Sequence, residues 1–149
     1  MKRIGILATV MFMLALSMSS QAQYKMAAGV RFSNDEAVVS NSISFKYFFN
    51  DATAVEGLFS FSDPGALGVL IEQHKKLLSK NFRWFYGGGG YVGFGEGKIV
   101  GLQGVIGIDY KLPLIPLNLS IDWKPEINLA RVFIVEPEAI GLSARFTFK

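Results

Sequence analysis

After about residue 23 of this 149-residue chain, apolar and polar residues alternate one by one, and this period of two constrains the fold more than any other feature. Over 117–124 every odd position is apolar and every even position is polar. The same alternation runs through 24–33 and 140–148 and, apart from Phe48, through 42–49. Successive side chains of a β-strand point to opposite faces, so the pattern predicts strands with one apolar face and one polar face.

Turn-forming residues divide the alternating region into eight runs of about ten residues, the length that crosses a membrane when the strand is tilted. The predicted connections are 33–36, 50–51, 62–65, 79–81, 96–98 (a tight hairpin), 112–116 and 128–138. The fourth run, 66–78, could instead form a helical turn near its end, but its place between strands favours a strand. The expected fold is therefore all-β: an eight-stranded antiparallel up-and-down transmembrane barrel.

The N-terminus has the three parts of a secretory signal peptide. A basic start, Met1-Lys2-Arg3, is followed by an apolar stretch over 4–16 and by small residues at Ser20 and Ala22. The stretch is shorter than the roughly 20 apolar residues of a spanning helix, which argues against a membrane anchor. We expect cleavage after Ala22, leaving a barrel domain over 23–149.

Charge and composition exclude several classes of function. The formal charge of the whole chain is +3, and removal of Lys2 and Arg3 leaves +1, without a basic run beyond Lys75-Lys76, so nucleic-acid binding is not expected. The chain has no cysteine, which excludes thiol nucleophiles and cysteine-ligated zinc. With one histidine and no calcium-loop pattern, we expect neither a metal nor another cofactor.

Half of the residues are hydrophobic, 13 of them phenylalanine, yet no later segment resembles a spanning helix. An apolar face spread over alternate positions suits the lipid side of a barrel. The aromatic residues gather near run ends, as in the girdles of membrane barrels: Tyr24, Phe32, Tyr47, Phe49, Phe59, Phe61, Phe82, Trp84, Tyr110, Trp123, Phe146 and Phe148. A soluble barrel would have to pack these rings inside, where they would overfill a small lumen.

The opposite, polar face predicts a network of charged side chains in the lumen. Its charges are of both signs and alternate with small residues; Lys25 and Gln103 share the face with the predicted network of Arg31, Lys46, Glu56, Arg83, Asp109, Asp122, Lys124 and Arg145. An eight-stranded barrel is just wide enough for side chains to fill it. Paired charges that plug the lumen are therefore favoured over a gate for small solutes or ions.

A run of glycines, 87–90, superficially resembles a phosphate-binding loop. Such loops lie between a strand and a helix and carry a Lys-Ser/Thr or a spaced acidic residue, neither of which follows here. Glycines within barrel strands instead relieve curvature and let neighbouring groups approach the backbone. We interpret the run as structural.

The end of the chain resembles the assembly signal of outer-membrane barrels, with outward positions Leu142, Ala144, Phe146 and Phe148. Together with 104–110 and 121–125, it makes residues 23–149 similar to the outer-membrane protein β-barrel domain family, the small OmpA/OmpX-like and OmpW-like barrels, in a Bacteroidetes-type form. One departure is Lys149, because the family pattern usually ends on the aromatic residue.

The resemblance implies export through the Sec pathway, periplasmic chaperones, insertion by the barrel-assembly machinery and residence among the lipids of a Gram-negative outer membrane. Both termini and the turns near 50–51, 79–81 and 113–116 would be periplasmic. The outward loops would be short, except for 128–138, which includes the apolar stretch Phe133-Ile134-Val135.

The sequence favours a non-enzymatic barrel with a structural role or a narrow conduit for small solutes. One alternative is a lipid-modifying enzyme, but its base would have to be His74, with Ser60 or Ser62 approaching from another strand. We interpret His74 instead as a polar residue at the membrane interface. A second alternative is a soluble periplasmic barrel that binds a hydrophobic ligand.

Overall fold

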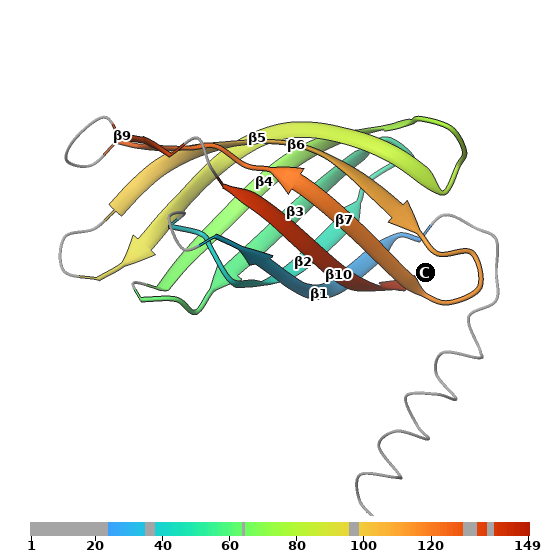
Figure 1. Ribbon diagram of the computed structural model, residues 1–149, viewed down its shortest axis with the longest axis horizontal. Helices are drawn as coiled ribbons and strands as arrows, with labels where there is room; N and C mark the ends of the chain where they lie inside the picture. The colour runs from blue at the N-terminus through green and yellow to red at the C-terminus, as the bar shows by residue number, and fades with distance from the viewer. Residues whose placement is uncertain (1–23, 35–37, 64, 96–98, 130–133, 137–138) are drawn as a thin grey trace, which may run out of the picture.

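The computed structural model describes residues 24–34, 38–63, 65–95, 99–129, 134–136 (backbone only) and 139–149 (Figure 1). The predicted signal peptide, the hairpin at 96–98 and most of the predicted long loop lie outside the described residues. No helix within the described ranges is long and apolar enough to span a membrane.

Ten antiparallel strands form one sheet that closes on itself through the pairing of β5 with β6. The strands are β1 (Met26–Ser33), β2 (Ser42–Phe48), β3 (Thr53–Ser60), β4 (Gly65–Lys76), β5 (Phe82–Phe94), β6 (Ile99–Lys111), β7 (Leu117–Trp123), β8 (Glu126–Asn128), β9 (Ile134–Glu136) and β10 (Ile140–Phe148). All but β8 and β9 form the closed barrel, in which the first strand, β1, pairs with the last, β10. The predicted eight-stranded antiparallel barrel is confirmed, and the ambiguous fourth run is a strand, β4.

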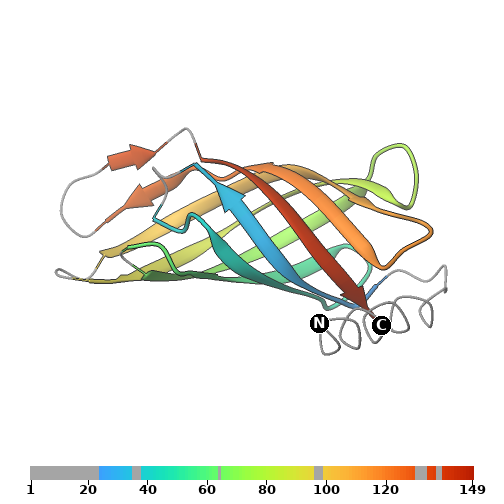
Figure 2. The same cartoon turned by 60° about the horizontal axis from the view of Figure 1, so that its bottom comes forward.

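The predicted seventh run is interrupted at Lys124-Pro125, between β7 and β8. Proline has no backbone N–H to donate to a neighbouring strand. Its carbonyl still accepts a hydrogen bond from the Gly104 backbone N–H at 3.0 Å, so the register with β6 continues into β8. After Lys124 the chain no longer pairs with β10. Instead β8 pairs with β9, and the two strands form a short hairpin at the end of the barrel remote from the C-terminus (Figure 2).

The connections divide the barrel into two ends. The terminal end contains Tyr24, Lys149 and the connections 49–52, 77–81 and 112–116, and the loop end contains the opposite ends of the barrel strands with the described residues 34, 38–41, 61–63, 95, 129 and 139.

The two faces of the barrel wall differ sharply in polarity. Along β2, for example, Ile43 and Phe45 are about half exposed on the outer face, whereas Ser42, Ser44 and Lys46 are fully buried on the inner face. The outer positions of the described strands carry no charged residue except Lys75, at the terminal end of β4. The residues of the predicted assembly signal lie on this outer face of β10, and all but the half-buried Ala144 are exposed.

Most aromatic residues predicted for the apolar face lie on the outer face, but the prediction for Tyr24 is wrong. Tyr24 is only 8% exposed, and its hydroxyl donates a hydrogen bond to Asp109 Oδ2 at 3.3 Å. Lys25, which the alternation placed on the polar inner face, is exposed. The chain bends at Lys25, just before β1 begins, so the alternation of 26–33 does not extend back to these two residues.

The glycine run lies within β5, where two of its members allow neighbouring strands to approach closely. A Cβ added to Gly87 would overlap the Ile71 carbonyl of β4, and one added to Gly89 would overlap the Val69 carbonyl. Gly88 and Gly90, on the other face, have room: the nearest atom to an added Cβ is 3.4 Å away at each. The structural interpretation of the run is thus supported by the geometry of the β4–β5 ladder.

We expect Gly89→Ala to destabilise the barrel by about 1–3 kcal/mol, because the added methyl group must push β4 and β5 apart. Gly88→Ala, one residue away on the opposite face, is the matched control and should change stability by well under 1 kcal/mol. The measurement is the free energy of unfolding from urea titration followed by tryptophan fluorescence. Equal effects of the two substitutions would show that the close approach at Gly89 is unimportant.

Candidate functional site

The interior of the barrel holds the chain's principal cluster of polar groups. All eight residues of the predicted lumen network lie there, each no more than 7% exposed: Arg31, Lys46, Glu56, Arg83, Asp109, Asp122, Lys124 and Arg145. Gln103, which the alternation placed on the same face, is buried with them, and the structure adds Glu72, His74, Asn118 and Glu126. Every strand of the closed barrel contributes at least one polar side chain to this interior.

The buried charges balance. Five cations (Arg31, Lys46, Arg83, Lys124 and Arg145) and five carboxylates (Glu56, Glu72, Asp109, Asp122 and Glu126) lie in the interior. An isolated ion in a low-dielectric interior costs many kcal/mol, so buried charges occur in pairs or networks. The interior therefore carries no net formal charge when every carboxyl group is ionised and His74 is neutral.

Glu56 on β3 is at the centre of the network. Its Oε1 accepts hydrogen bonds from Arg145 Nη2 on β10 and from Ser44 Oγ on β2, both at 2.5 Å. Arg145 also donates from Nε to Ser44 Oγ at 2.6 Å and from Nη1 to Ser120 Oγ of β7 at 2.8 Å. One guanidinium thus connects β2, β3, β7 and β10 across the lumen.

Lys46 links Glu56 to a second carboxylate, Glu72 on β4. Its Nζ lies 2.7 Å from Glu72 Oε2 and 3.6 Å from Glu56 Oε2. The same ammonium group lies 4.6 Å from the centroid of the Phe85 ring, a cation–π distance. Lys46 is thereby held between two carboxylates and an aromatic face, with none of its side chain exposed.

His74 extends the network toward the terminal end. Its Nε2 lies 2.8 Å from Glu72 Oε2 and its Nδ1 lies 3.6 Å from Asp109 Oδ2. The imidazole stacks on Phe85 with ring centroids 5.0 Å apart and also contacts Phe48. The prediction that His74 is an interfacial residue is therefore wrong, because its side chain points inward along with Glu72 and Leu70 of the same strand.

Toward the loop end, Arg31 forms a two-pronged ion pair with Asp122. Arg31 Nη2 lies 2.5 Å from Asp122 Oδ1, and Nε donates to Oδ2 at 3.3 Å. The guanidinium lies against Gly141 of β10, where an added Cβ would overlap it. The glycine at this position gives the arginine the room to reach across from β1 to β7.

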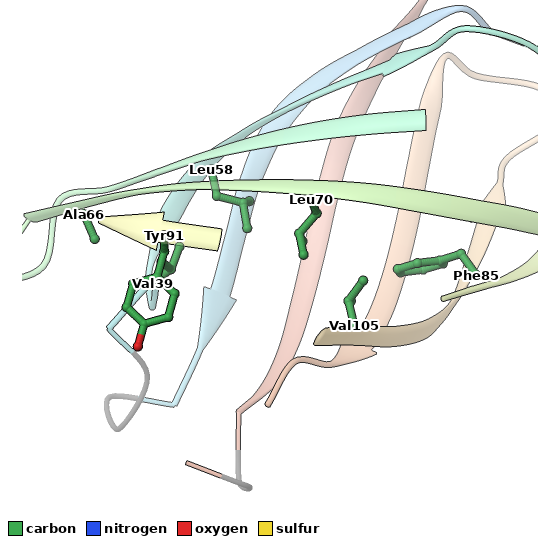
Figure 3. Close-up of a cluster of buried hydrophobic side chains, with 7 residues drawn as sticks. All are labelled: Val39, Leu58, Ala66, Leu70, Phe85, Tyr91 and Val105. Atoms are coloured by element: carbon green, nitrogen blue, oxygen red, sulfur yellow. The ribbon is translucent and has the colours of Figure 1, made fainter. Parts of the chain in front are cut away.

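At the loop end, Val38 and Val39 of the segment between β1 and β2 pack into the mouth of the barrel. Glu126 accepts hydrogen bonds from the backbone N–H groups of Val38 at 2.8 Å and Val39 at 3.2 Å, and it pairs with Lys124 Nζ at 2.5 Å. Val39 is fully buried in an apolar cluster whose other members are Leu58, Ala66, Leu70, Phe85, Tyr91 and Val105 (Figure 3). A carboxylate on β8 thus fixes an apolar plug in the mouth of the barrel.

Arg83 closes the terminal end in a comparable way. Its guanidinium donates to the backbone carbonyls of Lys80 at 3.1 Å and Asp51 at 2.9 Å. Tyr24, Ala27, Phe48 and Ala54 form a second buried apolar cluster nearby. Apolar and hydrogen-bonded groups therefore occupy both ends of the lumen, with the charged network between them.

The burial of these side chains shows that the lumen is filled. Lys46 and Lys124 have no exposed surface, and Arg31 and Arg145 are 1% exposed. A continuous water-filled passage would leave measurable surface on the groups that line it. The described interior is therefore packed with side chains, as expected for a barrel of eight strands.

Among the described residues, the two serines considered as nucleophiles, Ser60 and Ser62, do not lie near His74. Ser60 pairs with Ala66, eight positions before His74 on β4, so Ser60 lies toward the opposite end of the barrel. Ser62 lies farther still from His74, and its Oγ forms a hydrogen bond with Ser40 Oγ at 2.5 Å. His74 contacts carboxylates and aromatic rings and is sealed from solvent.

Sequence reasoning missed Glu72, His74 and Glu126 as lumen residues, although the signal was present. The inward positions of β4 are all even-numbered, so the alternation already places Glu72 and His74 beside Leu70. The possible helical turn over this stretch obscured that pattern. Glu126 continues the even-numbered inner face of β7 beyond Pro125.

Among the residues that the structure describes, no three histidine or carboxylate side chains form a group suited to holding a metal ion. The chain matches no protein-family model, and comparison with curated proteins and with solved structures gives no significant match.

Glu56→Gln and Arg145→Met should each destabilise the barrel by about 3–5 kcal/mol, because each leaves a buried charged partner uncompensated. The double variant should be more stable than the sum of the two effects predicts, by roughly 1–3 kcal/mol. Urea unfolding of the four proteins in the cycle measures this coupling.

The control cycle pairs Glu56→Gln with Arg31→Met, because Arg31 binds Asp122 rather than Glu56. These two substitutions should be additive. Additivity in the Glu56–Arg145 cycle as well would contradict the central role of that ion pair.

Proposed function

We propose that this protein is an integral β-barrel of the Gram-negative outer membrane with a closed lumen and a structural, non-enzymatic role. The observation that carries the proposal is the reversed polarity of the barrel: charged and polar side chains fill the inside, and a surface that is apolar apart from a few polar residues and Lys75 forms the outside. Such a surface is stable only against an apolar solvent such as the hydrocarbon core of a bilayer.

The outer surface also has the composition expected at depth in a membrane. Phenylalanine, leucine, isoleucine and valine side chains between 38% and 63% exposed occur on every strand of the closed barrel. The many exposed large hydrophobic groups form a continuous band instead of an isolated patch. A monomeric soluble protein rarely exposes so large a contiguous apolar area.

The filled interior favours a structural role over a conduit. The lumen side chains are paired across the barrel, and the Val38–Val39 segment occupies the mouth at the loop end. Solute passage would require several buried ion pairs to separate together. Separating a buried ion pair costs several kcal/mol of free energy in a low-dielectric interior.

The two alternatives receive less support. A ligand-binding soluble barrel needs an apolar cavity and a polar outside, which is the reverse of the distribution seen here. An enzyme needs its catalytic groups within reach of substrate, whereas His74 is only 3% exposed. Export by a cleaved signal peptide is part of the proposal and is supported by the sequence of residues 1–22.

The first experiment is fractionation of the native host, followed by gel electrophoresis with and without boiling. The proposal expects recovery with the outer membrane only in detergent, and a band whose mobility shifts on boiling. Planar bilayers containing the folded protein should show no stepwise ion conductance. A soluble periplasmic protein would contradict the membrane assignment, and regular conductance steps would contradict the closed lumen.

We expect Val69→Lys to reduce the yield of folded, membrane-inserted protein sharply. Val69 lies on the outer face near the middle of β4 and is 46% exposed, and a lysine at the bilayer midplane costs about 2–4 kcal/mol. Gln73→Lys, on the same face but near the terminal end, should cost no more than about 1 kcal/mol. Folded yield is measured by the unboiled gel band, and equal yields would contradict membrane burial of the outer face.

A further inference from the structure

The charges of residues 24–149 fall into three groups along the barrel. In the interior, the five basic and five acidic side chains balance in number, as described above. The terminal end carries six lysines (Lys25, Lys75, Lys76, Lys80, Lys111 and Lys149) and one carboxylate, Asp51. In the sequence, the segments that join the opposite ends of the strands (34–41, 61–64, 95–98 and 129–139) contain six acidic residues (Asp35, Glu36, Asp63, Glu96, Glu136 and Glu138) and two basic ones (Lys98 and Arg131). The small net charge of the chain conceals this separation.

The lysines of the terminal end are distributed around the barrel. They come from the start of β1, the end of β4, the β4–β5 connection, the end of β6 and the C-terminus. Five of the six are exposed, and Lys111 is half-buried with its Nζ donating to the carbonyls of Leu112 and Ile115. This arrangement is a ring of positive charge and not a single patch.

Two of the lysines are positioned by aromatic rings on the outer face. Lys75 Nζ lies 5.6 Å from the ring centroids of both Trp84 and Tyr86, which stack on each other at 5.2 Å. Lys25 Nζ lies 5.7 Å from the ring centroid of Tyr47. Tryptophan and tyrosine concentrate at the level of lipid headgroups, with the apolar ring toward the acyl chains. The ammonium groups beside them therefore lie at headgroup depth.

We propose that the terminal end binds the headgroups of anionic glycerophospholipids, with Lys25 and Lys75 as the principal contacts. The inference rests on the proposed membrane location. A phosphodiester accepts the ammonium hydrogen bonds and its negative charge complements the ring of lysines. The connections at the opposite end of the strands are acidic in sequence, so the proposal confines the preference to the leaflet that faces the terminal end.

The test uses the folded barrel, stripped of lipid in detergent, and native mass spectrometry to count bound lipids. Phosphatidylglycerol and phosphatidylcholine with identical acyl chains are added at equal concentration, and lipid A is added in a separate arm. The proposal expects several-fold more bound phosphatidylglycerol than phosphatidylcholine. Lys25→Gln and Lys75→Gln should each weaken that preference roughly five-fold, because each lysine near an anionic surface raises the affinity by about this factor.

Lys98→Gln is the matched control, because it removes the same charge from the connection between β5 and β6 at the loop end, and it should leave the preference unchanged. Lys76→Gln/Lys80→Gln provides a second test at the terminal end if either principal variant folds poorly. Equal binding of the two phospholipids, stronger binding of lipid A than of phosphatidylglycerol, or an equal loss in Lys98→Gln would overturn the proposal.

These outcomes are separable from failure of the proposed function. If the protein is not a membrane barrel, it will not fractionate with the outer membrane and will show no band that shifts on boiling. If only the headgroup proposal fails, the protein will still insert and shift on boiling but will bind both phospholipids equally.

Discussion

The pairing of Glu56 with Arg145 is the interaction on which the rest of the interior depends. It joins β3 to β10, and its two hydroxyl partners, Ser44 and Ser120, bring in β2 and β7. Lys46 then connects this centre to Glu72 and His74. A barrel this narrow has no room for water to solvate ten buried charges, so their mutual pairing is a condition of folding.

The requirement that buried charges be paired also explains the packing at the loop end. Glu126 would be an isolated charge near the mouth without Lys124, and its remaining capacity as an acceptor is used by the Val38 and Val39 backbone. The apolar side chain of Val39 is thereby drawn into the lumen. A carboxylate thus positions a hydrophobic plug, and the plug in turn shields the ion pairs from solvent and strengthens them.

The sequence was sufficient to predict the barrel, its strand number and the polar face, because strict alternation leaves little freedom in a sheet with two unlike faces. It was insufficient where the period breaks. The bend at Lys25 turned Tyr24 inward, and Pro125 separated β8 from β7. The ion pairs across the lumen could not be predicted from the sequence either, because the partner of Arg145 depends on the stagger of strands that are far apart in the sequence.

The position of Arg145 on the last strand has a consequence for how the protein is made. The cation that neutralises Glu56 lies 89 residues later in the chain, on a strand that is synthesised after the other seven strands of the barrel. Until β10 arrives, β1 and β7 each have an open edge and the central carboxylate lacks its main partner. The barrel therefore cannot close strand by strand from the N-terminus, and the earlier strands must be kept from aggregating until β10 is available.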